Sequence, residues 1–340
     1  FKIQNTTKST PVDFTMIHTD HSSHTAPIFN RSQLCLGQKI NGPAIILEPT
    51  ATTIVEPGWQ AIQSELSHLI LSRMVPLRKN RAPGTEASPV MLEIFNNLFM
   101  SIAEQMGATL ANTAYSVNIK ERLDFSCAIF DPIGNLVANA PHLPVHLGSM
   151  GESIKTVIRQ NAGKVKPGDV FALNAPYNGG THLPDVTVIT PVFNDDNTNI
   201  LFYVGSRGHH ADIGGRTPGS APPDSKTIHE EGILIDNLLI VDRSGLKTRE
   251  IMNLLRSGKY PCRNPHQNLA DLNAQIAANE TGVKELMKMI DNFGLDVVQA
   301  YMGHVQDNAE ESVRRVIDVL KYGEFVYNLD NGSKICVKII

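Results

Sequence analysis

Two strand-like runs in the middle of this chain are bounded on their outer sides by glycine-rich loops that carry histidine. The runs VTVITPVF and ILFYVGS are rich in β-branched and aromatic residues, which is typical of strands. The loop GGTHLPDV precedes the first run, and SRGHHADIGG follows the second. If the runs are neighbours in one sheet, we expect both loops to lie at the same edge of that sheet.

Two imidazoles and a carboxylate would then meet at that edge. The first loop contributes His182 and Asp185, and the second contributes His209 or His210. Such a mixed nitrogen and oxygen set suits Mn²⁺, Zn²⁺ or Fe²⁺ and leaves positions for water or substrate. Residues three apart on a regular strand point to opposite faces, so His182 and Asp185 can share a metal only if Pro184 breaks the strand. The alternative is that these side chains only form hydrogen bonds within polar loops.

Further polar residues extend this candidate pocket. The segment APHLPVHLGSM carries His142 and His146 directly before a helix start expected at Ser149. His146 is either an acid/base or ligand in the pocket or part of a turn-rich connector. Arg122, in NIKERLDFS, could receive a substrate carboxylate, although such runs more often form a solvated surface. We assign to catalysis His146, His210 and Asp212. We assign to substrate binding Arg122, Gly180 and Thr181.

The rest of the sequence predicts an α+β (mixed α/β) protein with two folded parts. Residues 1–75 contain short β-branched runs separated by proline and glycine, which indicate a small β-rich unit. Residues 76–88 gather charge, proline and glycine as a linker does. We expect residues 89–340 to form a larger domain with a mixed sheet, glycine-rich loops and a helical C-terminal third.

Apolar residues at steps of three and four predict the helices of that domain. One helix begins at Ser88-Pro89, where the hydroxyl can cap free amides, and runs to about Leu110. A second begins at Asn264-Pro265, a third ends near Leu320, and a shorter one lies near 152–159. The second carries a polar arc that either packs against loop backbone, which we favour, or lines a pocket. The arc consists of Asn268, Asp271, Gln275 and Asn279.

Composition excludes several classes of protein. The 30 Lys and Arg against 34 Asp and Glu give a net charge of -4 without a basic stripe, so nucleic acid is not an expected partner. No apolar run approaches the roughly 20 residues that span a bilayer, and the first residues lack the apolar core of a signal peptide. The four cysteines form no CxxC pair, which favours a reducing, cytoplasmic setting over a disulfide scaffold.

Longer motifs closely resemble the hydantoinase/5-oxoprolinase family across nearly the whole chain. They are GPAIILEPTATTIVEPGW, AEQMGATLANTAYSVNIKERLDFSCAIFD, APHLPVHLGSM, NAPYNGGTHLPDVTVITPVF, GHHADIGGRTPGSAPPDS, EEGILI and DLNAQIAAN. The resemblance implies that residues 1–75 are the C-terminal tail of a hydantoinase A-type part, which binds ATP in this family. It implies that residues 89–340 are the N-terminal portion of a hydantoinase B-type part, which also resembles an acetone carboxylase subunit.

The resemblance also implies a function: ATP-dependent opening of the cyclic amide 5-oxoproline to glutamate. It places a divalent metal at His182, Asp185 and His209 or, less surely, His210, with ATP and Mg²⁺ at a partner segment outside this chain. The expected partners are the remaining A-type and B-type segments and further copies in a homo-oligomer. Ala175, in NAPY, stands where the family usually has an aspartate, so any role of that carboxylate is missing.

Rival functions are an N-methylhydantoinase or acetone-carboxylase-like activity and, from another class, a non-catalytic metal-stabilised assembly module. Because the nucleotide-binding segment is expected upstream of this sequence, we expect the chain alone to be inactive.

Overall fold

The computed structural model describes residues 8–19, 22–75 and 84–339. The chain divides into two compact units, Phe1–Asn80 and Arg81–Ile340. This division falls within the predicted linker 76–88, of which residues 76–83 lie outside the described residues.

The first unit is built from two small sheets around an apolar core. One sheet has the strand order β1-β2-β4-β5 and the other has the order β3-β6-β7. Their bounds are β1 (Asp13–Thr19), β2 (Ser22–Asn30), β3 (Lys39–Asn41), β4 (Ala44–Glu48), β5 (Ala51–Val55), β6 (Trp59–Gln63) and β7 (Leu69–Arg73). The buried core includes Phe29, Leu34, Ile40 and Ile46. The predicted β-rich unit is therefore confirmed.

The second unit is centred on a seven-stranded sheet. Its strands are β8 (Phe125–Phe130), β9 (Leu136–Asn139), β10 (Val170–Leu173), β11 (Asp185–Phe193), β12 (Ile200–His209), β13 (Leu238–Asp242) and β14 (Gly245–Leu246). Their order is β14-β13-β10-β11-β12-β8-β9, and every neighbouring pair is antiparallel. The mixed α/β class is confirmed. The sheet itself is wholly antiparallel, whereas we expected a sheet with both parallel and antiparallel strands. Most neighbouring strands follow one another along the chain, so they need no parallel crossover.

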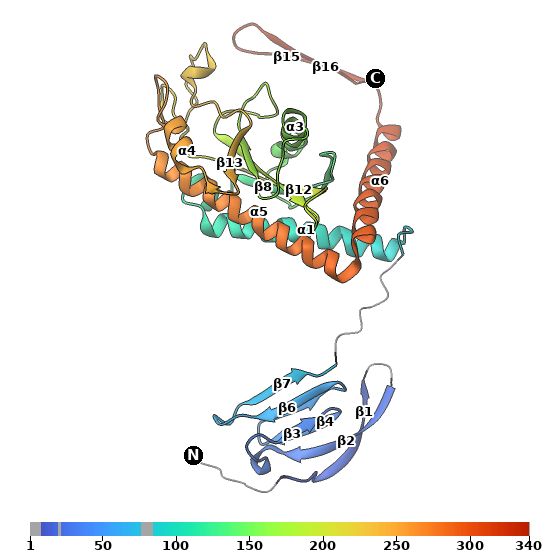
Figure 1. Ribbon diagram of the computed structural model, residues 1–340. Helices are drawn as coiled ribbons and strands as arrows, with labels where there is room; N and C mark the ends of the chain where they lie inside the picture. The colour runs from blue at the N-terminus through green and yellow to red at the C-terminus, as the bar shows by residue number, and fades with distance from the viewer. Residues whose placement is uncertain (1–7, 20–21, 76–83, 340) are drawn as a thin grey trace. The chain divides into compact units, whose positions relative to one another are not determined.

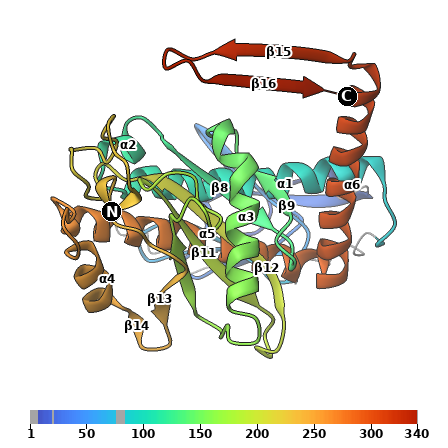
Figure 2. The same cartoon turned by 90° about the horizontal axis from the view of Figure 1, so that it is seen from above.

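Helices cover both faces of this sheet (Figures 1 and 2). They are α1 (Pro89–Thr113), α2 (Val117–Lys120), α3 (Pro144–Gln160), α4 (Thr248–Leu255), α5 (Pro265–Phe293) and α6 (Leu295–Val319). Side chains alternate along β8, so Cys127 and Ile129 join the core under α1 and α5, whereas Ala128 and Phe130 join the core under α3. Burying one large apolar side chain of this kind contributes about 2 kcal/mol.

The start of α3 differs from our prediction. We expected a helix start at Ser149 and a helix near 152–159, but α3 begins at Pro144. Proline needs no N–H partner in the first turn, so Pro144 can open the helix there. His146 consequently lies in the first turn of α3. Ser88 is the N-cap of α1, as predicted, but within the described ranges its hydroxyl makes no capping hydrogen bond.

The polar arc of α5 packs against backbone, as we favoured, but against the backbone of strands as well as the loop backbone that we expected. Gln275 Nε2 donates to carbonyl oxygens of β11 and β12 at 2.8 and 3.1 Å. Asn279 Nδ2 donates to a β11 carbonyl at 3.1 Å. Asp271 Oδ1 accepts from two backbone N–H groups in the connection between α1 and α2. The Gln275 and Asn279 contacts fix α5 to β11 and β12, and the Asp271 contacts fix it to the connection between α1 and α2.

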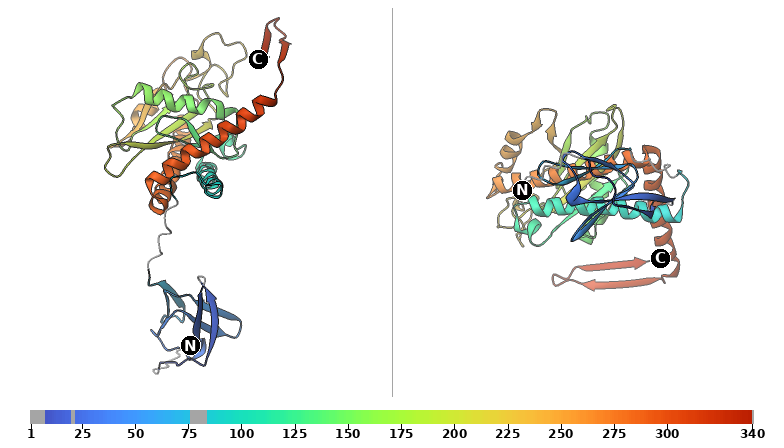
Figure 3. Two further views of the ribbon diagram at one scale, coloured as in Figure 1. Left: turned by 90° about the vertical axis from the view of Figure 1, so that its right-hand side faces the viewer. Right: turned by 90° about the horizontal axis from the view of Figure 1, so that it is seen from below.

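The C-terminal end of this unit is exposed. The last turns of α6 and the hairpin of β15 (Gly323–Asn328) and β16 (Lys334–Ile339) stand apart from the sheet (Figure 3). Phe325 pairs with Val337, and Tyr327 pairs with Ile335, so these side chains share one apolar face. A two-stranded hairpin alone has marginal stability in water. Within the described part of the chain, no helix is both long enough and apolar enough to cross a membrane.

We predict that Asn174→Ala destabilises the second unit. Asn174 is fully buried, its Nδ2 donates to Leu183 O and Ile233 O, and its Oδ1 accepts from Ile235 N. Alanine leaves these three backbone groups buried without their partner, which costs about 3 kcal/mol in the free energy of unfolding. Urea-induced unfolding measures this loss.

Asn178→Ala provides the matched control, because Asn178 forms its side-chain hydrogen bond with Asp236 at the surface. We expect this variant to lose less than about 1 kcal/mol. Equal losses in the two variants would contradict a bracing role for Asn174.

Candidate metal centre

The β11–β12 hairpin brings the two histidine-bearing loops together. The strands pair antiparallel, with Asp185, the first residue of β11, directly opposite His209, the last residue of β12. A carboxylate and an imidazole therefore lie side by side at one edge of the sheet. The prediction that both loops lie at the same edge is confirmed.

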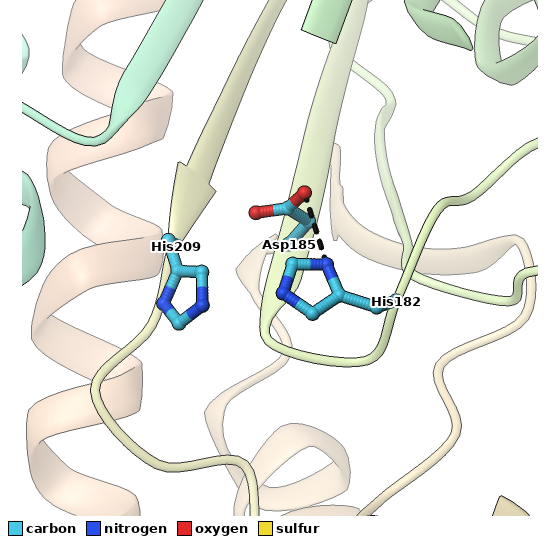
Figure 4. Close-up of side chains that lie close together, drawn as sticks. All are labelled: His182, Asp185 and His209. Carbon is cyan, nitrogen blue, oxygen red and sulfur yellow. Dashed lines mark ion pairs between the residues drawn. The ribbon is translucent and has the colours of Figure 1, made fainter. Parts of the chain in front are cut away.

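His182 reaches the same point because the chain turns immediately before β11. The Asp185 N–H donates to the His182 carbonyl oxygen at 3.0 Å, so the strand is interrupted around Pro184 as the shared site requires. His182 Nδ1 lies 3.1 Å from Asp185 Oδ2 (Figure 4). The ring centroids of His182 and His209 are 5.0 Å apart. One ligand atom from each of these three residues lies within 4.8 Å of the other two.

The two oxygens of Asp185 have very different surroundings. Oδ2 accepts from the Thr181 hydroxyl at 2.8 Å and lies near the rings of His182 and His146. Oδ1 is buried, and among the described residues it has no hydrogen-bond partner. In Figure 4 this second oxygen lies on the side of His209. A buried carboxylate oxygen without a partner is costly, and a bound cation would supply the missing interaction.

The surrounding charges keep Asp185 ionised. Burial alone would raise the pKa of its carboxyl, but hydrogen bonds and positive charge from His146 and His182 outweigh burial and hold that pKa far below its usual range. In turn, the hydrogen bond to Asp185 raises the pKa of His182 against the opposing effect of burial. A carboxylate that stays charged is available as a metal ligand across the physiological range.

A buried arginine on β12 lies beside this cluster. Arg207 donates to the hydroxyls of Thr187 and Ser153, both at 2.8 Å, and to the hydroxyl of Ser149. Burial lowers the pKa of Arg207 to about 10, while the charge of Asp185 opposes that change. Arg207 is therefore cationic at neutral pH and adds positive potential next to Asp185. Our sequence reasoning did not single it out, because Arg207 follows the apolar run within SRGHH and nothing in that local pattern marks it as buried.

His146 extends the cluster towards the strand next to β12. Its Nε2 lies 3.4 Å from Asp185 Oδ2 and 4.0 Å from Asp124 Oδ1. Sequence reasoning gave Asp124 no role. Asp124 directly precedes β8, which pairs with β12, and its carbonyl oxygen accepts from the His209 N–H at 3.0 Å. Pairing of these non-consecutive strands is what brings Asp124 to the site.

The structure does not bring His210 and Asp212 into this cluster. His210 is buried against α5, where its Nδ1 lies 3.1 Å from Asn268 Nδ2 and its Nε2 lies 3.1 Å from Gln275 Oε1. Burial lowers the pKa of His210. Asp212 forms an ion pair with Arg263 at 2.6 Å. Of the two histidines considered for the third ligand, the geometry favours His209.

The three residues assigned to substrate binding lie in different settings. Arg122 is exposed in the turn after α2. The Thr181 hydroxyl donates to Asp185 Oδ2, so Thr181 orients a candidate metal ligand. Gly180 is required by backbone packing, because a Cβ there would lie 2.4 Å from the Asn174 carbonyl oxygen.

Comparisons with known proteins agree with the resemblance in the sequence. Residues 88–340 match the sequence model of the Hydantoinase B/oxoprolinase family. The 5-oxoprolinase 1 of Arabidopsis thaliana is 46% identical over 302 residues, which are 86% of this chain and 24% of that relative. The chain therefore spans about a quarter of the length of this curated relative.

Two solved structures share the fold. An ATP-dependent caprolactamase from Pseudomonas jessenii superimposes with a TM-score of 0.66 at 26% identity, over 75% of this chain and 45% of that chain. An acetone carboxylase in its nucleotide-free form gives a TM-score of 0.63 at 17% identity, over 70% of this chain and 31% of that chain. The second likeness concerns the fold alone. With the family match over residues 88–340 and the identity to the plant relative, the chain belongs to the hydantoinase B/oxoprolinase family.

Proposed function

We propose that this chain supplies the metal-assisted site of an ATP-dependent cyclic amide hydrolase that opens 5-oxoproline to glutamate. The observation that carries the proposal is the convergence of His182, Asp185 and His209 at one edge of the sheet. The relative named 5-oxoprolinase 1 and the structural neighbour named an ATP-dependent caprolactamase support the reaction class. An N-methylhydantoinase or acetone-carboxylase-like activity is the same-class alternative.

The residues present fit a divalent metal. Two imidazoles and one carboxylate form a donor set that suits Mn²⁺, Zn²⁺ or Fe²⁺, and the partnerless Asp185 Oδ1 offers a ligand atom. His209 Nδ1 lies 2.8 Å from the side-chain amide of Asn118. If Asn118 turns its Oδ1 to this position, it accepts the Nδ1 proton and leaves His209 Nε2 for the metal. When bound, such a metal polarises a carbonyl oxygen or activates water.

Solvent access favours a catalytic centre over a purely structural one. The His182 side chain is 48% exposed, whereas the Asp185 side chain is 5% exposed. A structural site is usually closed by four protein ligands, whereas a catalytic site keeps a position open. A set of three protein ligands, one of which is the exposed imidazole of His182, leaves such a position. This supports the enzyme over the rival assembly module.

In the proposed reaction ATP transfers its terminal phosphoryl group to the lactam oxygen. ADP leaves, and the phosphorylated ring carbon is electrophilic, so one water can add to it and the ring C–N bond can break with the nitrogen taking up a proton. The resulting acyl phosphate is hydrolysed by a second water, which releases inorganic phosphate and glutamate. Positive groups around Asp185, above all the buried Arg207, stabilise negative charge that develops on the substrate. Arg122 would receive the carboxylate of 5-oxoproline. His146 can act as an acid/base or as a ligand.

The proposal includes partners, because ATP and Mg²⁺ would bind to an A-type segment outside the part described here. The remaining B-type segments would complete the enzyme. Assembly into a homo-oligomer and a cytoplasmic setting stay predictions, and light scattering on the purified protein measures the first of them.

We predict that His182→Ala and Asp185→Asn each lower the amount of Mn²⁺ retained by the chain after dialysis. Each substitution removes a donor atom from a three-residue set, so affinity falls strongly. Elemental analysis measures metal per chain, and circular dichroism checks the fold. His229→Ala is the control, because His229 lies in a short 3-10 helix outside the cluster. Unchanged metal content in both cluster variants would remove the metal role.

We predict that the assembled enzyme, with its A-type and B-type segments, releases ADP in response to 5-oxoproline. His182→Ala should lower this rate by about 10²–10³-fold, the usual effect of losing one group that stabilises transition-state charge. Parallel assays with hydantoin and acetone separate the same-class alternatives. A faster response to either of them would overturn the substrate assignment but not the metal site.

A further inference from the structure

We propose that a cavity between α1, the start of β8 and the connection from β9 to α3 binds the lactam ring of the substrate, with His142 as the hydrogen-bond donor to the lactam oxygen. The cavity has a volume of about 350 Å³. Small-molecule sites typically measure about 300–1,000 Å³. The inference rests on the proposed function, because the ligand is the cyclic amide named there, and it assigns the residues that hold this ligand.

The cavity adjoins the candidate metal centre through two segments of the chain. Leu123 and Phe125 line the cavity and flank Asp124 in the sequence. His142 also lines it and lies two residues before the start of α3, whose first turn carries His146. A ring bound in the cavity therefore lies against the same stretch of backbone that carries Asp124.

The contacts of His142 determine which ring nitrogen carries the proton. Its Nδ1 accepts from the backbone N–H of Cys127 at 3.2 Å. Because an amide N–H can only donate, the proton of the neutral ring is on Nε2. Burial and the nearby His146 lower the pKa of His142, so the ring is neutral at neutral pH. Within the described part of the chain Nε2–H has no hydrogen-bond partner, so it is available to a ligand.

The Nε2 edge of this ring lies at the wall of the cavity. A Cβ on Gly107 would lie 2.5 Å from both Cε1 and Nε2 of His142, and both residues line the cavity. The missing side chain at Gly107 is what lets the imidazole approach α1 so closely. Phe125 packs against the same ring edge-on, with centroids 4.8 Å apart. The donor therefore lies among apolar groups, where a hydrogen bond to a carbonyl oxygen is stronger than in water.

The other walls suit the carbon atoms of a lactam ring. Ala108 and Ala111 of α1 line the cavity together with Leu123 and Phe125, so most of the surface that a ligand meets is apolar. Leu123 has a φ of 54°, in the left-handed region that is unfavourable for leucine, and it is 52% exposed. A ligand ring in the cavity would cover apolar surface that is otherwise in contact with water.

A cation beside the cavity can receive the carboxylate of 5-oxoproline. Arg122 directly precedes Leu123 and is exposed. Its guanidinium makes no hydrogen bond or ion pair with the residues that the structure describes. A guanidinium can bind a carboxylate through two parallel hydrogen bonds. The ring would thus occupy the cavity while the carboxylate stays near solvent.

Calorimetric titration of the metal-free chain with three compounds tests this site. They are 5-oxoproline, 2-pyrrolidinone, which has the lactam without the carboxylate, and cyclopentanecarboxylate, which has the carboxylate without the lactam. We expect 5-oxoproline to bind most tightly. His142→Asn should weaken both lactams by up to about tenfold, the effect of one lost hydrogen bond, because asparagine can still accept from the Cys127 N–H but lacks Nε2–H. Arg122→Gln should weaken 5-oxoproline and leave 2-pyrrolidinone unchanged.

Ala108→Phe fills the cavity from the exposed side of α1 and should abolish binding of both lactams. Ser101→Phe is the matched control, since Ser101 is exposed on the same helix about two turns before Ala108 and does not line the cavity. It should bind like the unsubstituted chain, and thermal unfolding checks the fold of each variant. Unchanged lactam affinity in Ala108→Phe and His142→Asn, or no binding of 5-oxoproline to the unsubstituted chain, would overturn the subsite. Mn²⁺ retention is measured separately, so this result would leave the proposed metal centre standing.

Discussion

The antiparallel pairing of β11 with β12 is the interaction on which the site depends. It sets Asp185 opposite His209 and brings together two loops that are more than twenty residues apart in the sequence. Because side chains alternate along a strand, a register shift of one residue would turn one of these side chains away from the other. The Gln275 side chain helps to hold this pair, since it bonds to a carbonyl oxygen on each strand.

Hydrogen bonds of buried polar side chains, together with apolar packing, fix the positions of the residues in this region. Asn174 ties Leu183, the residue after His182, to the segment near Ile235, and Arg207 binds hydroxyls from β11 and α3. Groups of this kind are costly to bury unless each finds a partner. Among the described residues of this unit, Ser116 Oγ, Asp271 Oδ2 and Asn279 Oδ1 lack a partner as well as Asp185 Oδ1. Of these atoms, Asp185 Oδ1 belongs to the carboxylate that lies between two histidine rings, so its missing partner bears on the candidate metal centre.

Sequence patterns predicted the local features and missed those that depend on strand order. Composition and glycine-rich flanks predicted the hairpin, and apolar spacing predicted α1, α5 and α6 closely. Asp124 was not assigned, because its position follows from the pairing of β8 with β12, strands that are not consecutive. The choice between His209 and His210 was also left open, since neighbouring residues at the end of a strand point to opposite sides and only the register decides between them.

The ionisation of Asp185 links the fold to the chemistry. Burial on its own would favour the neutral acid, which is a poor metal ligand. Here the imidazoles of His146 and His182 outweigh burial, so the carboxylate remains charged where the sheet edge meets solvent. Histidines that stabilise this charge in the absence of metal are the same side chains that can donate to an ion when one binds. The folded chain therefore holds the candidate ligands in place before an ion binds. The same arrangement places several ionisable groups around one carboxylate.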